Sequence, residues 1–99
     1  MQQEVDQVFL KMRGGHMELL LVFENPAGAR QRETLRYPTQ NAIEAVRRAA
    51  KQLAYRGTIH TVKNTRFRRE EHGELKDDGE LRRLFISEFE YHAEDDEWD

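Results

Sequence analysis

The fold is decided by the segment Thr39–Arg56, TQNAIEAVRRAAKQLAYR, which has the pattern of an amphipathic helix. Apolar residues recur in it at offsets of three and four, and alanines widen this stripe to about half of the circumference at roughly 100° per residue. The stripe consists of Ala42, Ile43, Ala45, Val46, Ala49, Ala50, Leu53 and Ala54. Such a face must be covered, so the sequence predicts a helix packed on a hydrophobic core.

Both ends of this helix carry boundary signals. Asn41, followed three residues later by Glu44, has the spacing of a capping box, and Thr39 is an alternative N-cap. Gly57 is suited to the left-handed conformation that commonly ends a helix, because it has no Cβ atom to clash. Arg56, just before it, suits the negative end of the helix dipole.

The opposite face of the same helix is basic, with Arg47, Arg48 and Lys51 beside Tyr55. Glu44 can pair with Arg47 or Arg48, but an exposed pair of this kind contributes only about 0.2–0.5 kcal/mol. Most of the positive charge is therefore expected to stay uncompensated. It forms either an ordinary solvated helix face or a surface for an anionic partner.

The rest of the chain has the patterns of strands and turns. Apolar residues on both faces of Met17–Glu24 indicate an inner strand of a sheet. Gly14 and Gly15 suit a tight hairpin turn before it, so Val5–Arg13 is expected to pair antiparallel with it. Alternatively, the Gly15–Met17 stretch is a cloning junction and the native chain starts at Met17. The next strand, Arg32–Tyr37, folds back after an Asn-Pro-Ala-Gly turn.

Two further strands are expected after the helix. Thr58–Arg69 is rich in β-forming residues, and a bulge near Lys63 would reconcile its imperfect alternation. Asp78-Gly79 suits a type I′ turn, and Leu81–Tyr91 follows with Leu81, Phe85, Phe89 and Tyr91 on one face. We therefore expect an α+β fold, in which an antiparallel sheet of four to five strands, in the order ββ(β)αββ, carries one amphipathic helix on one face.

Length and composition indicate a single small domain. We expect residues 1–92 to form this α+β domain, with residues 1–6 frayed, and residues 93–99 to form an acidic tail. The chain has no cysteine, its longest apolar run is Leu19–Phe23, and its start lacks a signal-peptide pattern, which favours a cytoplasmic protein without membrane contact. The oligomeric state, monomer or homodimer, stays open.

No motif indicates catalysis or a cofactor. The only serine is Ser87, without a glycine elbow around it, and the chain has neither a phosphate-binding glycine loop nor a dinucleotide fingerprint. The four histidines lack the spacing of zinc ligands; Glu90, His92 and Glu94 could approach a divalent ion, but solvated side chains explain them more simply. We expect a protein that is not an enzyme and holds no metal.

The charge is sharply sorted along the chain, although the net charge is only −3. Residues 30–69 contain eleven Lys or Arg against two Glu, whereas residues 70–99 contain thirteen Asp or Glu against three Lys or Arg. The acidic end either covers the basic region within the chain or mimics the charge of phosphate groups for a partner. The basic region is the candidate site for an anionic partner, with Tyr55 and Phe67 as platforms on which bases stack. Our candidate binding residues are Arg47, Arg48, Lys51, Tyr55, Arg56, Lys63, Arg66 and Arg68.

The helix-to-strand passage Asn41–Val62 resembles that of small phage-encoded anti-CRISPR proteins. In both, an aromatic residue, a glycine and a strand led by threonine follow one another, here as Tyr55, Gly57 and Thr58. The resemblance implies a non-enzymatic inhibitor that blocks nucleic-acid binding by a defence complex. The residues themselves favour a non-catalytic protein that docks its basic helix and strand on nucleic acid or an anionic protein surface. An inhibitor or adaptor of a nucleic-acid-processing complex is the alternative.

Overall fold

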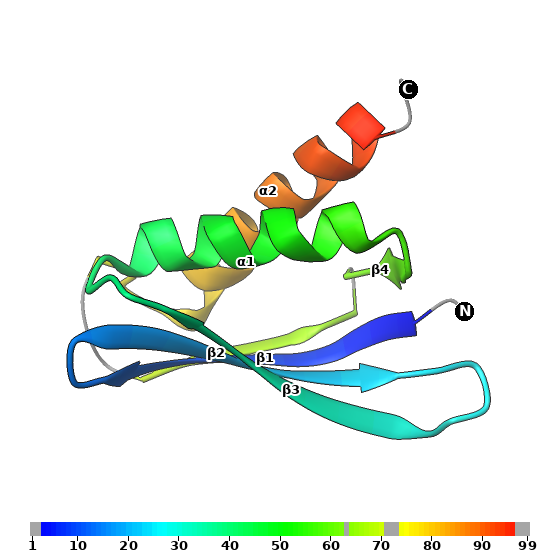
Figure 1. Cartoon of the computed structure of the whole chain (residues 1–99), viewed down its shortest axis with the longest axis horizontal. Helices are drawn as coiled ribbons and strands as arrows, with labels where there is room; N and C mark the ends of the chain where they lie inside the picture. The colour runs from blue at the N-terminus through cyan, green and yellow to red at the C-terminus, as the bar shows by residue number, and fades with distance from the viewer. Residues whose placement is uncertain (1–2, 63, 71–73, 97–99) are drawn as a thin grey trace.

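The computed structural model of the 99-residue chain describes residues 3–62, 64–70 and 74–96. A sheet forms one layer and two helices form the other, on one face of the sheet (Figure 1). The elements in chain order are β1 (Gln3–Arg13), β2 (His16–Glu24), β3 (Arg30–Tyr37), α1 (Ala42–Arg56), β4 (Ile59–Thr61), β5 (Arg66–Arg69) and α2 (Asp78–Asp96).

The sheet is mixed, in the order β3-β2-β1-β4, with β5 paired to the same edge of β1 as β4. The pairs β1/β2 and β2/β3 are antiparallel, as predicted, but β4 and β5 both run parallel to β1. The expectation of a purely antiparallel sheet was therefore wrong. Because α1 carries the chain back across the sheet after β3, the next strand starts beside the start of β1 and runs in the same direction.

Both inner strands of the sheet precede α1. β2 lies between β1 and β3, as its two apolar faces predict. β1 is hydrogen-bonded on both edges, and its side chains Val5, Val8 and Leu10 are buried in the core. Residues 3–13 thus form one of the two inner strands of the sheet.

Helix α1 follows the predicted pattern closely. The Asn41 side chain accepts a hydrogen bond of 3.0 Å from the backbone N–H of Glu44, which is the expected capping contact. Gly57 ends the helix with φ = 70°, in the left-handed region that favours glycine. The predicted apolar stripe is buried except for Ile43, which packs against the core while partly exposed.

The second helix, α2, corrects the sequence prediction. It occupies the segment in which we expected a turn at Asp78-Gly79 and a last strand, and residues 93–96 of the expected acidic tail continue it. The first turn is held by Asp77, whose carboxylate accepts a 2.8 Å hydrogen bond from the backbone N–H of Glu80. The described part of the chain thus contains two helices in the order βββαββα, in place of one helix and the order ββ(β)αββ.

The predicted apolar face of this segment is real, although its periodicity was misinterpreted. Leu81, Phe85 and Phe89 are buried, and they lie four residues apart. A spacing of four is shared by one face of a strand, with period 2, and one face of a helix, with period 3.6. Tyr91 separates the two interpretations: a strand would place it with Phe85 and Phe89, but it is exposed in the helix.

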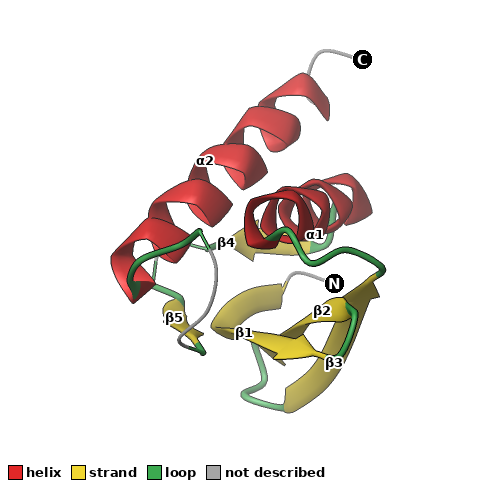
Figure 2. Ribbon diagram, turned by 90° about the vertical axis from the view of Figure 1, so that its left-hand side faces the viewer, coloured by secondary structure: helices red, strands yellow, loops and turns green. Residues whose placement is uncertain are grey.

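The core lies between the sheet and the two helices, which also pack against one another (Figure 2). The Phe67 and Phe85 rings join β5 to α2, with centroids 5.4 Å apart. The single strand expected over Thr58–Arg69 is divided into β4 and β5, and in this interruption the buried Thr65 hydroxyl donates a 2.5 Å hydrogen bond to the carbonyl oxygen of Val5. A bulge was expected there at Lys63, which lies outside the described residues.

Candidate functional site

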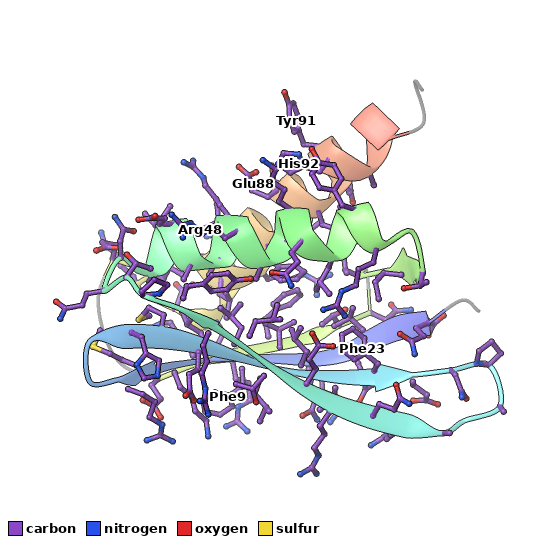
Figure 3. The ribbon with its side chains drawn as sticks, viewed as in Figure 1. Phe9, Phe23, Arg48, Glu88, Tyr91 and His92 are labelled. Atoms are coloured by element: carbon purple, nitrogen blue, oxygen red, sulfur yellow. The ribbon has the colours of Figure 1, made fainter. Side chains whose placement is uncertain are left out.

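The face of the sheet that points away from α1 and α2 is called the open sheet face here. Side chains alternate between the two faces of a strand, so the residues between successive core positions point to it. Figure 3 shows Phe9 on this side of the sheet, with both helices on the other side. Val22 supports the assignment, since it is only 8% exposed and yet does not belong to the core cluster between sheet and helices.

Strand register arranges the middle of the open sheet face in two rows across β5, β1, β2 and β3. One row is Arg66, Gln7, Val22 and Arg32, and the next is Arg68, Phe9, Leu20 and Thr34. Apolar side chains on β1 and β2 therefore form a central floor. Arginines border this floor on β5 at one margin and on β3 at the other.

Four cations of the open sheet face have no carboxylate partner among the described residues: Lys11, Arg32, Arg66 and Arg68. The three arginines are exposed. The Lys11 ammonium lies 5.1 Å from the centroid of the Phe9 ring, a cation–π contact at the edge of the apolar floor. No carboxylate of the described residues thus competes with an outside anion for these four cations.

Other basic groups of the same face are paired within the chain. Glu18 lies 3.2 Å from the His16 imidazole and 3.0 Å from the Arg36 guanidinium. These neighbours lower the pKa of Glu18, first through the His16 hydrogen bond and then through the charges around it. Arg30 lies 3.6 Å from Glu24 and 3.7 Å from Asp6. The unpaired cations are thus concentrated around Phe9 and Val22, in the middle of the face.

The predicted binding residues of α1 lie on the opposite side of the molecule. Arg47 pairs with Glu88 of α2 at 3.3 Å, and Arg48 pairs with Glu44 at 2.6 Å. The Lys51 ammonium lies 5.8 Å from the centroid of the exposed Tyr55 ring. The predicted Glu44 pair is confirmed for Arg48, but the expectation that most of this charge stays uncompensated was wrong for both arginines.

Arg56, the fifth predicted residue, is held by β3. Its guanidinium donates two hydrogen bonds to the Glu33 carboxylate, one of them 2.9 Å long. This bidentate pair lowers the pKa of Glu33 and raises the pKa of Arg56, with the hydrogen bonds as the main cause in both. Arg56 therefore ties the end of α1 to the edge of the sheet.

The eight predicted residues do not form one surface. Four are on the outer face of α1, Arg56 pairs with Glu33, and Arg66 and Arg68 are on the open sheet face beyond the core. Lys63 lies outside the described residues. The prediction overlooked Phe9, although its alternation with the core residues Val8 and Leu10 already places it on the other face of their strand.

The outer side of the helices holds a second cluster of polar and aromatic groups. Glu88 lies between Arg47 and His92, at 3.3 Å from each. His92 in turn lies 3.5 Å from the Tyr55 hydroxyl, and the rings of Tyr55 and Tyr91 both meet its ring edge to face (Figure 3). The Arg47–Glu88 and Tyr55–His92 contacts join α1 to α2, so we assign these four residues a structural role in helix packing.

Two sequence expectations concern features that the described part of the chain lacks. It contains no group of three His, Asp or Glu side chains placed to hold a metal ion, and the side chain of Glu94, which we had considered as a ligand, is outside the described set. Within the same residues no helix is both long and apolar enough to cross a membrane.

Comparison with protein-family models, curated proteins and solved structures finds no match to this chain. The resemblance of Asn41–Val62 to anti-CRISPR proteins therefore stays a prediction.

Proposed function

We propose that this chain is a non-catalytic binding protein whose open sheet face binds nucleic acid. The observation that carries the proposal is the contrast between the two sides of the molecule. On the helical side Arg47 and Arg48 form ion pairs with the chain's own carboxylates and only Lys51, of the three predicted cations on the outer face of α1, has none, whereas Arg32, Arg66 and Arg68 all lack a carboxylate partner among the described residues. Binding to a polyanion releases the counterions of its phosphates and is driven by cations of this kind.

The shape of the face also suits a polymer. Phosphate-binding groups lie on both sides of an apolar floor that belongs to two inner strands. A regular sheet holds the Cα atoms of these residues at fixed spacings, so the positions from which the side chains extend are set before the ligand arrives. The floor supplies contacts that depend on bases, and the margins supply contacts that depend on charge.

The proposal is tested by the salt dependence of binding. Labelled DNA and RNA oligonucleotides, single-stranded and duplex, are titrated with protein between about 50 and 200 mM salt. If four cations meet phosphates of a single strand, the logarithm of the affinity should fall with that of the salt concentration at a slope of about −3. The variant Arg66→Gln/Arg68→Gln should reduce this slope by about 1.4.

A matched control is available on α1. The variant Arg47→Gln/Arg48→Gln removes the same charge from the helical side, so its affinity should change little, apart from the screened effect of net charge. The proposal is overturned if no oligonucleotide binds with a steep salt dependence. It is equally overturned if the α1 variant weakens binding as much as the β5 variant does.

A further inference from the structure

We infer that the ligand of the open sheet face is a single strand, with one base stacked on Phe9 and successive phosphates bound by Arg66 and Arg68. This inference rests on the proposed function and assigns its substrate class. It starts from Phe9 and Leu20, two partly exposed apolar side chains in the middle of a charged face. In a sheet with one solvated face, strand residues ordinarily alternate between apolar side chains in the core and polar side chains toward solvent. An aromatic ring on the solvated side is therefore a candidate contact for a ligand.

The apolar floor favours a single strand over a duplex. In a duplex the faces of the bases are stacked on one another, and only their edges are accessible in the grooves. A duplex resting on the two arginine margins would thus leave Phe9 and Leu20 without an apolar contact. A single strand presents free base faces, which stack on aromatic side chains whatever the sequence.

The pairing of β5 with β1 indicates how the nucleic-acid strand runs across the open sheet face. Arg66 and Arg68 are two residues apart on β5 and on the same face, so their Cα atoms are separated by about 6.6 Å along the strand. A backbone running along β5 meets both guanidinium groups with neighbouring phosphates. Because Phe9 is the residue of β1 paired with Arg68, the base attached at that point lies over the Phe9 ring.

Lys11 completes the arrangement. Its ammonium lies over the Phe9 ring at 5.1 Å, on a long side chain with free rotations and no carboxylate partner among the described residues. A base that stacks on the ring displaces this ammonium, which then becomes available to a phosphate. The site therefore exchanges a cation–π contact for a base–aromatic contact and a charge pair.

The test replaces the ring while keeping apolar bulk. Phe9→Leu should weaken binding of an oligo-dT or oligo-U probe about tenfold, and Phe9→Tyr should restore it, because stacking needs an aromatic face. Tyr55→Leu, which removes an exposed aromatic ring from the helical side, is the matched control and should leave affinity unchanged. A duplex of the same length should bind more weakly than the single strand and should be insensitive to Phe9→Leu.

A spectroscopic measurement reports the contact directly. In a Trp98→Phe background, which removes the chain's single tryptophan, Phe9→Trp places the only indole on the open sheet face. Its fluorescence should be quenched on titration with oligo-dT and not with duplex. Circular dichroism melts of every variant verify that the fold is kept.

The two proposals fail in different ways. Absence of salt-dependent binding to any oligonucleotide overturns the proposed function and, with it, this inference. Salt-dependent binding that requires Arg66 and Arg68, but is equally tight for duplex and unaffected by Phe9→Leu, leaves the function standing and overturns the assignment of a single strand.

Discussion

Replacing Phe85 by alanine should destabilise the protein by about 3–5 kcal/mol, the range for emptying the site of a fully buried aromatic ring. The Phe85 side chain is 0% exposed and its ring packs 5.4 Å from that of Phe67. About 0.5–1.5 kcal/mol of the loss comes from this aromatic pair, beyond the burial of apolar area. Since a domain of this size is stable by only about 5–15 kcal/mol, Phe85→Ala removes between about a fifth of this stability and all of it. Phe85→Leu, at about 1 kcal/mol, provides a milder variant.

Tyr91→Ala is the control that makes this a test of helix α2. Six residues in a strand would put Tyr91 and Phe85 on the same face, but six residues of helix turn through about 600° and separate them. The Tyr91 side chain is 62% exposed, so its removal should change the free energy of unfolding by less than about 0.5 kcal/mol. Urea denaturation followed by far-ultraviolet circular dichroism measures all three variants. Equal losses for Tyr91→Ala and Phe85→Ala would refute the helix.

Three other perturbations test contacts that hold the fold. Because the pKa of Glu33 is lowered from 4.5, the ionised Glu33 stabilises the folded state above pH 4.5, and this contribution is lost as the pH falls through the folded-state pKa. Glu33→Gln should therefore lower the free energy of unfolding by up to about 1 kcal/mol at pH 7 and leave it unchanged in acid. A loss that persists at pH 2 contradicts the pairing with Arg56. Gly57→Ala should lower Tm by roughly 4–8 °C, because φ is 70° and a side chain is strained in this left-handed conformation. The added Cβ would meet no atom within 4 Å, so backbone strain is the cause of the loss. Gly15→Ala, at a glycine without positive φ, should lower Tm less. Glu88→Gln breaks the ion pair with Arg47 of α1 and alters the 3.3 Å contact with His92, so it should lower stability by up to about 1 kcal/mol in urea titrations. The exposed Glu90→Gln should not, and equal effects of the two variants would contradict the role of Glu88 in linking the helices.

The first helix could be predicted almost completely because its information is local. The Asn41 cap, the Gly57 end and the apolar stripe between them all act within a few residues of chain. The second helix was predicted as a strand because its buried apolar residues are four apart, a spacing that fits one face of a helix and one face of a strand equally well. The distinguishing signal was Asp77 followed by Glu80, a capping pair of the kind used correctly for α1.

The direction of β4 and β5 could not be predicted from local pattern. Whether a strand runs parallel or antiparallel depends on where the preceding connection delivers the chain, and a helix of 15 residues returns it to the starting end of β1. The single strand expected over Thr58–Arg69 is two short strands, β4 and β5, and both pair with β1. Local alternation indicated β structure in this segment without indicating its partner strand.

The availability of the basic residues for binding could not be predicted from local sequence either. Sequence counting found the basic residues, but the availability of each one depends on carboxylates that are distant in the chain: Glu33 for Arg56, and Glu88 for Arg47. The acidic segment was expected either to cover the basic region or to serve a partner. Within the described residues its helix pairs with α1 through Glu88 and Arg47, and it forms no ion pair with the four unpaired cations of the open sheet face.

The parallel pairing of β5 with β1 is therefore the step that creates the site. It aligns Arg68 with Phe9, residues separated by most of the chain, and places Phe67 on the core side so that both neighbouring arginines point to the open sheet face. An antiparallel β5 with its own register would present the same two arginines beside different residues of β1. If the open sheet face binds a single strand, one nucleotide contacts both Arg68 and Phe9. The effects of Arg68→Gln and Phe9→Leu on the binding free energy should then be coupled by about 0.5 kcal/mol or more in a double-mutant cycle. The effect of Arg36→Gln, on the outer strand β3, should be additive with that of Phe9→Leu.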